Sequence, residues 1–515
     1  MFAAGRKEMQ LMDQYTMDVI GLPGVVLMEN AGTKIAEEVI ASSPCENPRI
    51  IVLAGAGNNG GDGFVIARKL YDSGYDCVVC FIADPNKMKG DAKVHFDVYN
   101  KRGLPIWYFH NNSSRKLHNL LSEADIIVDA MLGTGVNGPV REPVSEIISF
   151  VNGLKSKIII SVDIPSGLNS DTGKSAGMAV KASKTVSFVY PKKGFFLQDG
   201  PKYIGEWKAV DISVPTSIVE NLDLQMPKVI TEPLVKEIIP KRPIDGHKGT
   251  FGHVLVFGGS RPYVGAPLFT AKSSLLSGAG LVTLAVPEGI YPMAASQMPE
   301  ALFFPLPEKN GQFSEHSLDE ISFKLQEFDV VAVGPGMGRF PEGEKWLEGL
   351  FYSLTGQPIV VDADALYLSR NILEMIRTYS GDVIFTPHPG EMAGLLNMTV
   401  SEVESDRIEV ASSFAKKYGI YLLLKGHRSI IASPDGEIFI NPAGNDSLGK
   451  GGSGDVLTGL IASFVAQGAT PLNAMVAGAY LHAKAGEEKS NLLSNYGVTP
   501  PDLIDGVREQ LNIII

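Results

Sequence analysis

The chain has 515 residues, 44% of them hydrophobic and 20% charged, an ordinary globular composition that excludes disorder over most of its length. Its 45 basic and 57 acidic side chains leave a formal net charge of −12, which argues against a nucleic-acid-binding protein, since such proteins need basic patches. A chain of this length is expected to form about two to four domains.

The sequence carries no signal for a membrane or for export. No apolar run reaches the roughly 18 residues that a membrane-spanning helix needs. The N-terminal residues mix charged and apolar types and do not resemble a secretory signal. Three cysteines, Cys45, Cys77 and Cys80, are too few for a disulfide framework. We therefore expect a cytoplasmic protein with no membrane and no nucleic acid among its partners, and we expect a homo-oligomer.

Short apolar runs alternate with helical segments in the first part of the chain. A helical segment is expected from Glu8 to about Ile40 and another from about Phe64 to Ser73. Apolar runs occupy residues 50–54, 77–82, 126–128, 158–162 and 185–189. Continuous apolar runs that alternate with helices predict a parallel sheet buried on both faces.

Short apolar runs alternate with helical segments again after His247. Apolar runs occupy residues 254–257, 281–286, 330–333, 359–361, 383–385 and 421–424. The sequence therefore predicts an α/β protein with two domains, residues 1–213 and residues 227–515, joined by a linker at residues 214–226.

A glycine-rich loop, Gly55–Gly63, follows the first apolar run. Its glycines let the backbone approach a ligand, and the N–H groups at the start of the next helix favour a phosphate. Three of its glycines fit the G-x-G-x-x-G pattern of hydride-transfer dinucleotide domains, which is one interpretation. The side chains of Asn58, Asn59 and Asp62 are unusual for that pattern and suit a cation as well. A tight turn without a ligand is the third interpretation.

Two further polar loops follow later strands of the first domain. Asp129 opens the segment 129–139, and Asp163 opens the segment 163–168. Open α/β sheets bind ligands beyond the carboxyl ends of their strands, so both carboxylates are well placed for function. One such aspartate alone is as well explained by a helix cap or a turn.

Together, residues 28–32, 58–63, 129–139 and 162–167 resemble the NAD(P)H-hydrate epimerase domain, a Rossmann-like three-layer sandwich, over about residues 1–213. The resemblance implies that Asp163 is catalytic and that Asn59, Asp129 and Ser166 hold a potassium ion. Inversion at C6 of the nicotinamide ring needs proton transfer or transient loss of the hydroxyl, and this choice stays open. The resemblance implies that the hydrated dinucleotide is bound by Asn58, Asn59, Gly60, Gly61, Asp62, Gly133, Thr134, Gly135, Val136, Asn137, Gly138, Pro139 and Asp163.

A second glycine-rich loop, Gly451–Asp455, precedes the apolar helical run 456–465. Glycines at a helix start form an anion hole, and a carboxylate beside it can take a proton from a hydroxyl that attacks a phosphoryl group. The alternative is that Asp455 caps the helix. Other polar or glycine-rich loops lie at the ends of expected strands and predict a composite site along one sheet edge: residues 334–338, 362–364, 386–391 and 425–427.

Residues 248–252, 265–267, 334–338, 387–391 and 449–455 resemble the ribokinase-like ADP- or ATP-dependent NAD(P)H-hydrate dehydratase, over about residues 227–513. The resemblance implies that Asp455 is the catalytic base and that Ala266, Gly336, His388 and Asp455 line the hydrate site. It implies an adenine nucleotide as co-substrate, with Mg²⁺ expected to offset its phosphate charges. The residues implied for the nucleotide are Lys425, Gly426, His427, Arg428, Ser429 and Gly454.

Both resemblances concern one damaged cofactor. They imply an enzyme that interconverts the R and S forms of hydrated NADH or NADPH and dehydrates the S form, using ADP or ATP to turn hydroxide into a phosphate leaving group. An alternative is a small-molecule kinase fused to a dinucleotide-binding regulatory domain. A non-catalytic dinucleotide sensor is a further alternative, and the three differ in whether they release free phosphate, a stable phosphorylated product or no product.

Overall fold

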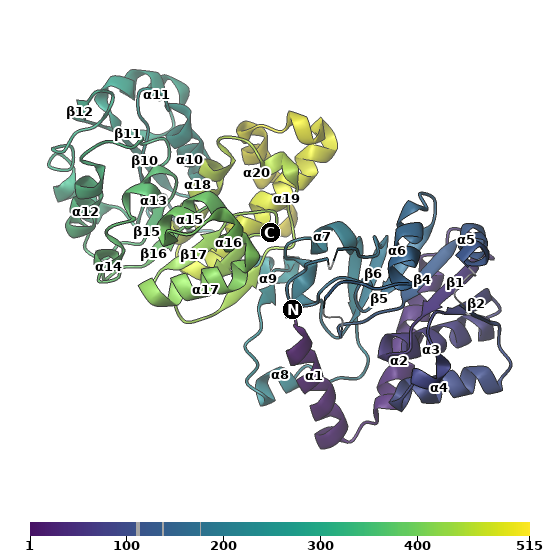
Figure 1. The fold of residues 1–515 in the computed structure, drawn as a ribbon. Coiled ribbons are helices and arrows are strands. Elements are labelled where there is room, and N and C mark those ends of the chain that lie inside the picture. Colours follow the sequence, from purple (N-terminus) through teal and green to yellow (C-terminus); the bar gives the residue numbers. More distant parts are fainter. Residues whose placement is uncertain (110–113, 136–137, 176) are drawn as a thin grey trace. The chain divides into compact units, whose positions relative to one another are not determined.

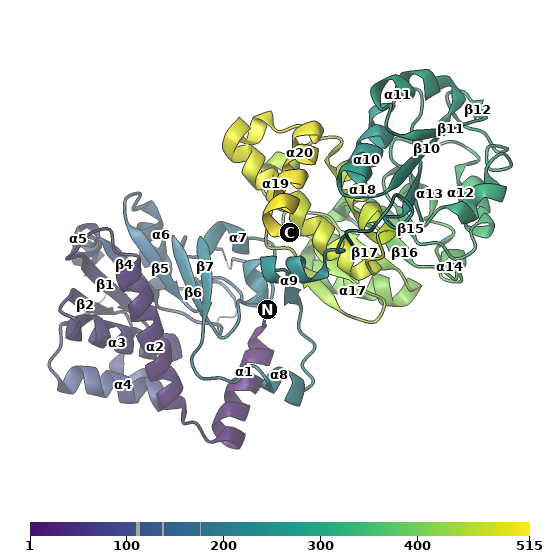
Figure 2. The same cartoon turned by 180° about the vertical axis from the view of Figure 1, so that it is seen from behind.

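The computed structural model describes residues 1–109, 114–135, 138–175 and 177–515, and the chain divides into two units, Met1–Pro227 and Lys228–Ile515 (Figure 1). Each unit is built on one large sheet of mainly parallel strands with helices packed on it (Figures 1 and 2), which confirms the α/β prediction. None of the helices in the described parts of the chain has both the length and the apolar character needed to cross a bilayer.

The sheet of the first unit has seven parallel strands within the described residues, in the order β3-β2-β1-β4-β5-β6-β7. The strands are β1 (Arg49–Ala54), β2 (Asp76–Phe81), β3 (Ile106–Tyr108), β4 (Ile126–Ala130), β5 (Ile158–Val162), β6 (Lys184–Phe188) and β7 (Glu206–Val210). The strand order reverses between β1 and β4, the point at which doubly wound sheets bind ligands.

Helices cover both faces of this sheet. They are α1 (Arg6–Tyr15), α2 (Gly24–Ala41), α3 (Asn58–Asp72), α4 (Gly90–Lys101), α5 (Ser114–Glu123), α6 (Val144–Gly153), α7 (Gly200–Tyr203) and α8 (Ile218–Asn221). In β1, Ile50 and Val52 pack into one core with residues of α2, α3 and α4, while Ile51 and Leu53 pack into a second core with residues of α5 and α6. The uninterrupted apolar sequence of β1 is thereby explained, because successive side chains enter opposite cores.

The N-terminal helical segment is interrupted, which differs from the single segment expected from Glu8 to about Ile40. After α1 come a π-helical turn, Thr16–Ile20, and then Gly21, whose φ of +86° is in the left-handed region. Pro23 precedes α2 and lacks the N–H that a continuing helix needs. The break lets α1 leave the direction of α2 (Figures 1 and 2).

Residues 214–226, predicted as an interdomain linker, pack as part of the first unit. Val214, Ile218, Val219 and Met226 are buried in the same core as α2 and α3. The apolar side chains at these positions account for the difference, because leaving them in an extended linker would expose them to water.

The large sheet of the second unit has ten strands among the described residues, in the order β11-β10-β9-β14-β15-β16-β17-β18-β19-β8. Neighbours are parallel except at β17–β18 and β18–β19. The strands are β8 (Lys228–Val229), β9 (His253–Phe257), β10 (Leu281–Pro287), β11 (Leu302–Leu306), β14 (Val330–Val333), β15 (Ile359–Val361), β16 (Val383–Phe385), β17 (Tyr421–Leu424), β18 (Ile430–Ala432) and β19 (Ile438–Ile440), with a separate hairpin of β12 (Glu308–Lys309) and β13 (Gln312–Phe313).

Helices also pack on both faces of this second sheet. They are α9 (Glu232–Ile238), α10 (Gly265–Leu276), α11 (Tyr291–Gln297), α12 (Gly343–Ser353), α13 (Asp364–Leu368), α14 (Leu373–Ile376), α15 (Pro389–Leu396), α16 (Val400–Ser405), α17 (Arg407–Tyr418), α18 (Ser453–Ala466), α19 (Pro471–Gly497) and α20 (Pro500–Ile514). Val254 and Val256 of β9 face a core shared with α10, α18 and α19. On the other face, Phe257 contacts Trp346 of α12 with ring centroids 5.4 Å apart.

Gly459 allows α18 to lie directly against α10, because a Cβ at this position would overlap the carbonyl oxygen of Thr270. We predict that Gly459→Ala lowers the free energy of unfolding of the second unit by about 1–3 kcal/mol, since neither backbone can yield cheaply. Gly349→Ala in α12 is the control, because its Cβ would meet only the end of the Leu318 side chain. Equal urea midpoints for the two variants would contradict the prediction.

Candidate active sites

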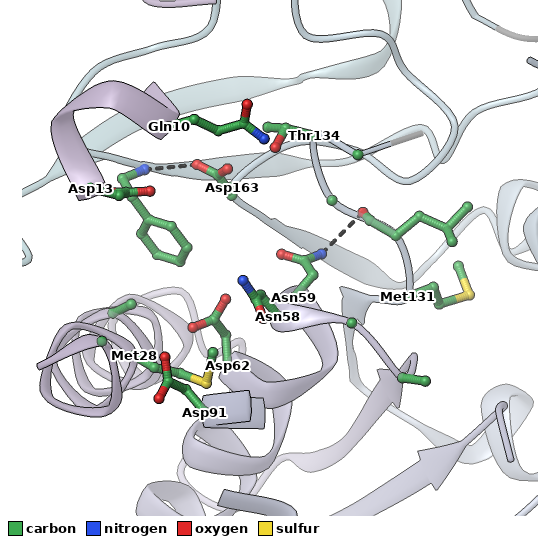
Figure 3. Close-up of a pocket in the computed structure, with 18 of the residues that line it drawn as sticks. Gln10, Asp13, Met28, Asn58, Asn59, Asp62, Asp91, Met131, Thr134 and Asp163 are labelled. Atoms are coloured by element: carbon green, nitrogen blue, oxygen red, sulfur yellow. Dashed lines mark hydrogen bonds between the residues drawn. The ribbon is translucent and has the colours of Figure 1, made fainter. Parts of the chain in front are cut away.

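A cavity of about 810 Å³ lies at the carboxyl ends of β1, β4 and β5 in the first unit (Figure 3). Its wall includes the loops after β1 and β4, the turn after β5, and residues of α1, α2 and α3. The cavity therefore occupies the position at which the strand order reverses, where loops from neighbouring strands diverge and leave space.

Some residues of the glycine-rich segment border the cavity, and others pack against the protein interior behind it. Asn58, Asn59 and Asp62, at the start of α3, border the cavity. Gly60 and Gly61 do not border it. A Cβ on Gly60 would overlap the backbone of Gly55, and one on Gly61 would overlap Ala92 and Met28, so these glycines permit close packing behind the loop.

Asn59, Asp129 and Ser166, predicted as potassium ligands, are brought together around the backbone of Leu132. The Leu132 carbonyl oxygen accepts hydrogen bonds from Asn59 Nδ2 at 3.1 Å and Ser166 Oγ at 3.2 Å. Asp129 is fully buried and accepts hydrogen bonds from Ser161 Oγ at 2.9 Å and from Ser166 N at 2.8 Å. Burial raises the pKa of Asp129 although these hydrogen bonds oppose the shift.

The Asp163 carboxyl is held by a buried lysine. Its Oδ1 accepts hydrogen bonds from Lys192 Nζ at 2.5 Å and from Phe188 N at 3.0 Å. The Lys192 side chain is only 1% exposed, and its ammonium also donates to Ser187 Oγ at 2.9 Å. Asp163 has a φ of +62°, in the left-handed region that is unfavourable for a residue with a side chain. Sequence reasoning missed Lys192, because it belongs to no recognisable motif.

Three more carboxyl groups, those of Asp13, Asp62 and Asp91, border the cavity without an ion-pair partner among the described residues. Asp62 is 6% exposed, and burial together with the charges of Asp163 and Asp13 raises its pKa well above the usual range. Burial and the charge of Asp163 raise the pKa of Asp13 to about 6, while Lys192 opposes the shift. Sequence reasoning missed Asp13, although Gln10, Asp13 and Met17 have the spacing of one helix face and all border the cavity.

The loop after β4 borders the cavity in part. Of its predicted substrate contacts, Gly133, Thr134, Gly135 and Pro139 border the cavity, and Gly138 does not. The two remaining predicted contacts, Val136 and Asn137, lie outside the residues that the structure describes.

The second unit gathers its polar loops at the carboxyl ends of β15, β16 and β17 around a buried ion pair. Lys425 Nζ lies 2.8 Å from Asp362 Oδ1 and 3.9 Å from Glu391 Oε2. Asp362 is 1% exposed and also accepts a hydrogen bond from Thr458 Oγ1 at 2.7 Å. Burial alone would raise the pKa of Asp362, but Lys425 outweighs it and lowers the pKa.

Asp455 lies in the first turn of α18, which begins after Gly452, a residue with φ of +92°. Burial and the charge of Asp362 raise the pKa of Asp455 to about 7, with Lys425 acting against the shift. Burial likewise raises the pKa of Glu391 to about 7. Near neutral pH, both carboxyls are therefore able to take up and release a proton.

Other predicted residues of the second unit lie around Asp455. Thr270 Oγ1 donates to the carbonyl oxygens of Ala266 at 3.2 Å and of Asp455 at 3.1 Å. A Cβ on Gly336 would contact the Ala266 side chain, so these two residues adjoin. Thr270 of α10 therefore links Ala266 to Asp455, and Gly336 lies against Ala266.

His388 and Gly454 adjoin the ion pair that includes Lys425. A side chain on Gly454 would contact Lys425 Nζ. His388 caps α15: its Nδ1 accepts hydrogen bonds from Gly390 N at 3.0 Å and Glu391 N at 3.3 Å. The His388 side chain remains 56% exposed, so its ring combines a capping role with access to solvent.

The loop after β17 carries the remaining predicted nucleotide contacts. Gly426 and His427 are exposed, Arg428 Nη1 donates to Gly444 O at 3.0 Å, and Ser429 Oγ donates to Gly426 O at 3.4 Å. Sequence reasoning missed His482, which is buried with Nε2 3.2 Å from Ser453 Oγ; burial lowers the pKa of His482 to about 4.

Both units match known proteins. A family model described as NAD(P)H-hydrate dehydratase matches residues 254–508, and one described as YjeF-related protein N-terminus matches residues 24–194. The bifunctional NAD(P)H-hydrate repair enzyme of Moorella thermoacetica is 37% identical over 509 residues, which cover 98% of this chain and 96% of that one. The enzyme of the same name from Thermofilum pendens is 35% identical over 508 residues, which cover 98% and 95%. A solved structure of the ADP/ATP-dependent NAD(P)H-hydrate dehydratase from Bacillus subtilis is 28% identical, with a TM-score of 0.49, over 56% of this chain and 99% of that one.

The charge of Asp13 is predicted to destabilise the first unit above pH 6. Its pKa of about 6 exceeds the roughly 3.9 of an unfolded aspartate, so the stability present at low pH is lost as the pH rises through 6. We predict that Asp13→Asn raises the thermal midpoint by about 2–4 °C at pH 8 and leaves it unchanged near pH 4. Asp18→Asn, an exposed control in the next turn, is expected to change neither value. A pH-independent effect of Asp13→Asn would contradict the prediction.

Proposed function

The chain belongs to the bifunctional NAD(P)H-hydrate repair enzymes, and we propose that residues 1–213 carry the epimerase and residues 227–515 the dehydratase, with residues 214–226 completing the core of the first unit. The enzyme interconverts the R and S forms of hydrated NADH or NADPH. It dehydrates the S form with ADP or ATP, which become AMP or ADP while phosphate is released. The observation that supports the division is that each family match falls within one unit with its own polar site.

Asp455 is the proposed catalytic base of the dehydratase. Its carboxylate takes the proton of the C6 hydroxyl while that oxygen attacks the terminal phosphorus of the nucleotide. Phosphate then leaves C6, and loss of a proton from C5 restores the ring double bond. The pKa of Asp455, raised to about 7 by burial and by Asp362, supports this role, because a base works best when its pKa is near the working pH.

Substrate and nucleotide are proposed to meet at the edge of the second sheet. Ala266, Gly336 and His388 would contact the hydrate together with Asp455. The arrangement of Gly454 against Lys425 supports a phosphate position there, since a glycine leaves space and an ammonium attracts the anion. Proposed nucleotide contacts are Lys425, Gly426, His427, Arg428, Ser429 and Gly454. Mg²⁺ is proposed to offset the nucleotide charge.

In the epimerase, Asp163 is the proposed catalytic carboxyl, and residues of the loops after β1 and β4 are the proposed substrate contacts. Among the described residues, no group of three or more His, Cys, Asp or Glu is placed to hold a metal ion. The oxygens of Asn59, Asp129 and Ser166, with the Leu132 carbonyl, are nevertheless hard donors of the kind that suit potassium. A potassium ion there would supply positive charge next to the bound dinucleotide.

The ligands of the enzyme are small molecules, the hydrated cofactor and an adenine nucleotide. A homo-oligomeric assembly and a cytoplasmic location stay predictions. Light scattering on the purified protein tests the first, and fractionation of cells tests the second.

We predict that Asp455→Asn abolishes dehydration of the S form and spares R/S interconversion, because the two reactions use different units. In the unmodified enzyme, the dehydration rate should rise with pH through about 7 and then level off, since the base must be deprotonated. Recovery of reduced-cofactor absorbance measures dehydration, and Asp435→Asn, on an exposed turn, is the control. Normal recovery in Asp455→Asn would exclude the assignment.

We predict that epimerisation depends on potassium and that Asn59→Ala raises the potassium concentration needed for half the maximal rate. The rate is measured by resolving R and S forms over time, with choline replacing potassium at constant ionic strength. As a control, Asn59→Ala should dehydrate the pure S form at the same rate as the unmodified enzyme. Equal epimerisation rates with and without potassium would remove this site from the proposal.

A further inference from the structure

Four carboxyl groups line the cavity of the first unit, each from a different element, and one of them is Asp91 of α4. Asp13 comes from α1, Asp62 from α3 and Asp163 from the turn after β5 (Figure 3). Asp163 is paired with Lys192, whereas the carboxyl groups of Asp13 and Asp62 form no hydrogen bond or ion pair within the described residues. Asp62, at 6% exposure, points into the cavity, so a ligand there meets a nearly buried polar group without a partner.

α1 is fastened to the segment that supplies Lys192. Ala4 N donates to Pro191 O at 2.9 Å, and Lys193 N donates to Ala4 O at 2.9 Å. Glu8 Oε1 lies 2.6 Å from Lys193 Nζ. These contacts hold α1 over the cavity with Gln10 and Asp13 on its cavity face, so the position of Asp13 relative to the Lys192–Asp163 pair is fixed.

We propose that Asp13 is the catalytic acid of epimerisation and gives its proton to the C6 hydroxyl, with the Asp163 carboxylate beside it. This inference rests on the proposed assignment of epimerisation to the first unit. It adds to that assignment a residue outside the glycine-rich and strand-end loops, on a helix that the sequence motifs do not include.

The chemistry of C6 requires such a donor. The C6–H bond has no adjacent carbonyl to stabilise a carbanion, so inversion proceeds by breaking the C6–O bond. Asp13 protonates the hydroxyl, water leaves, and the electron pair of the ring nitrogen forms a double bond to C6. A water molecule then adds to the opposite face, Asp163 accepts its proton, and this proton returns to Asp13 through water, so that atoms and charge balance.

The charges around Asp13 fit this role. Burial and Asp163 raise the pKa of Asp13 to about 6, so a fraction of the group keeps its proton near neutral pH. Asp62 faces Asp13 from α3, Lys192 opposes the shift, and α8, also packed on α1, carries the exposed Glu220. The same carboxyl groups favour the positive charge that the ring acquires when the hydroxyl leaves.

The test compares Asp13→Asn and Asp13→Glu with the unmodified full-length enzyme, using resolved R and S hydrate and subtracting the uncatalysed rate. We expect Asp13→Asn to lower the kcat of epimerisation at least about 100-fold, the usual contribution of a general acid, with KM within threefold. Asp13→Glu should restore part of the rate. The loss of epimerase rate as the pH rises above about 6 should be absent from the residual activity of Asp13→Asn.

Two controls separate catalysis from folding. Dehydration of the S form by Asp13→Asn should equal that of the unmodified enzyme, and Asp18→Asn should epimerise normally. An unchanged kcat in Asp13→Asn, or an effect on KM alone, would overturn the inference and leave the proposed function standing. If the unmodified enzyme does not interconvert R and S at all, the assignment of the first unit itself fails.

Discussion

A lysine–aspartate ion pair with one almost fully buried partner, Lys192 in the first unit and Asp362 in the second, holds each of the two sites together. Lys192 holds Asp163 at 2.5 Å in the first unit, and Lys425 holds Asp362 at 2.8 Å in the second. An isolated charge at these depths would lose several kcal/mol of hydration, so each partner requires the other. Removing either lysine would leave a carboxylate without a counter-charge. The stability of each unit and the arrangement of its site therefore both depend on the ion pair.

Each pair also sets the proton affinity of its neighbours. Asp455 lies beside Asp362, and burial together with that negative charge raises the pKa of Asp455 to about 7. Asp13 lies beside Asp163, and the same combination raises the pKa of Asp13 to about 6. At each site one carboxylate forms an ion pair with a lysine, while a second carboxyl group can exchange a proton near neutral pH. This separation of roles between like groups is what acid–base chemistry requires.

The parallel sheets explain why such groups meet. Strands that run the same way end at one edge, and the loops that follow them carry the polar residues while the strands fill the cores. This regularity made the strand-end residues Asp129 and Asp163 recognisable in the sequence, together with the loop that precedes Asp455. It could not reveal Asp13, which lies on α1, or Lys192, which lies in the loop after β6 but belongs to no recognisable motif.

The α/β class, the positions of the strands and the glycine-rich loops could be recognised in the sequence, because apolar periodicity and turn residues reflect local geometry. The family could be recognised there as well, through motifs that are continuous in the chain. Three features became visible only in the folded chain: α1 turns away from α2 to cover the cavity, residues 214–226 complete the first core, and some carboxyl groups are paired while others are not. Burial and charge–charge distance depend on segments far apart in sequence, and no local pattern encodes them.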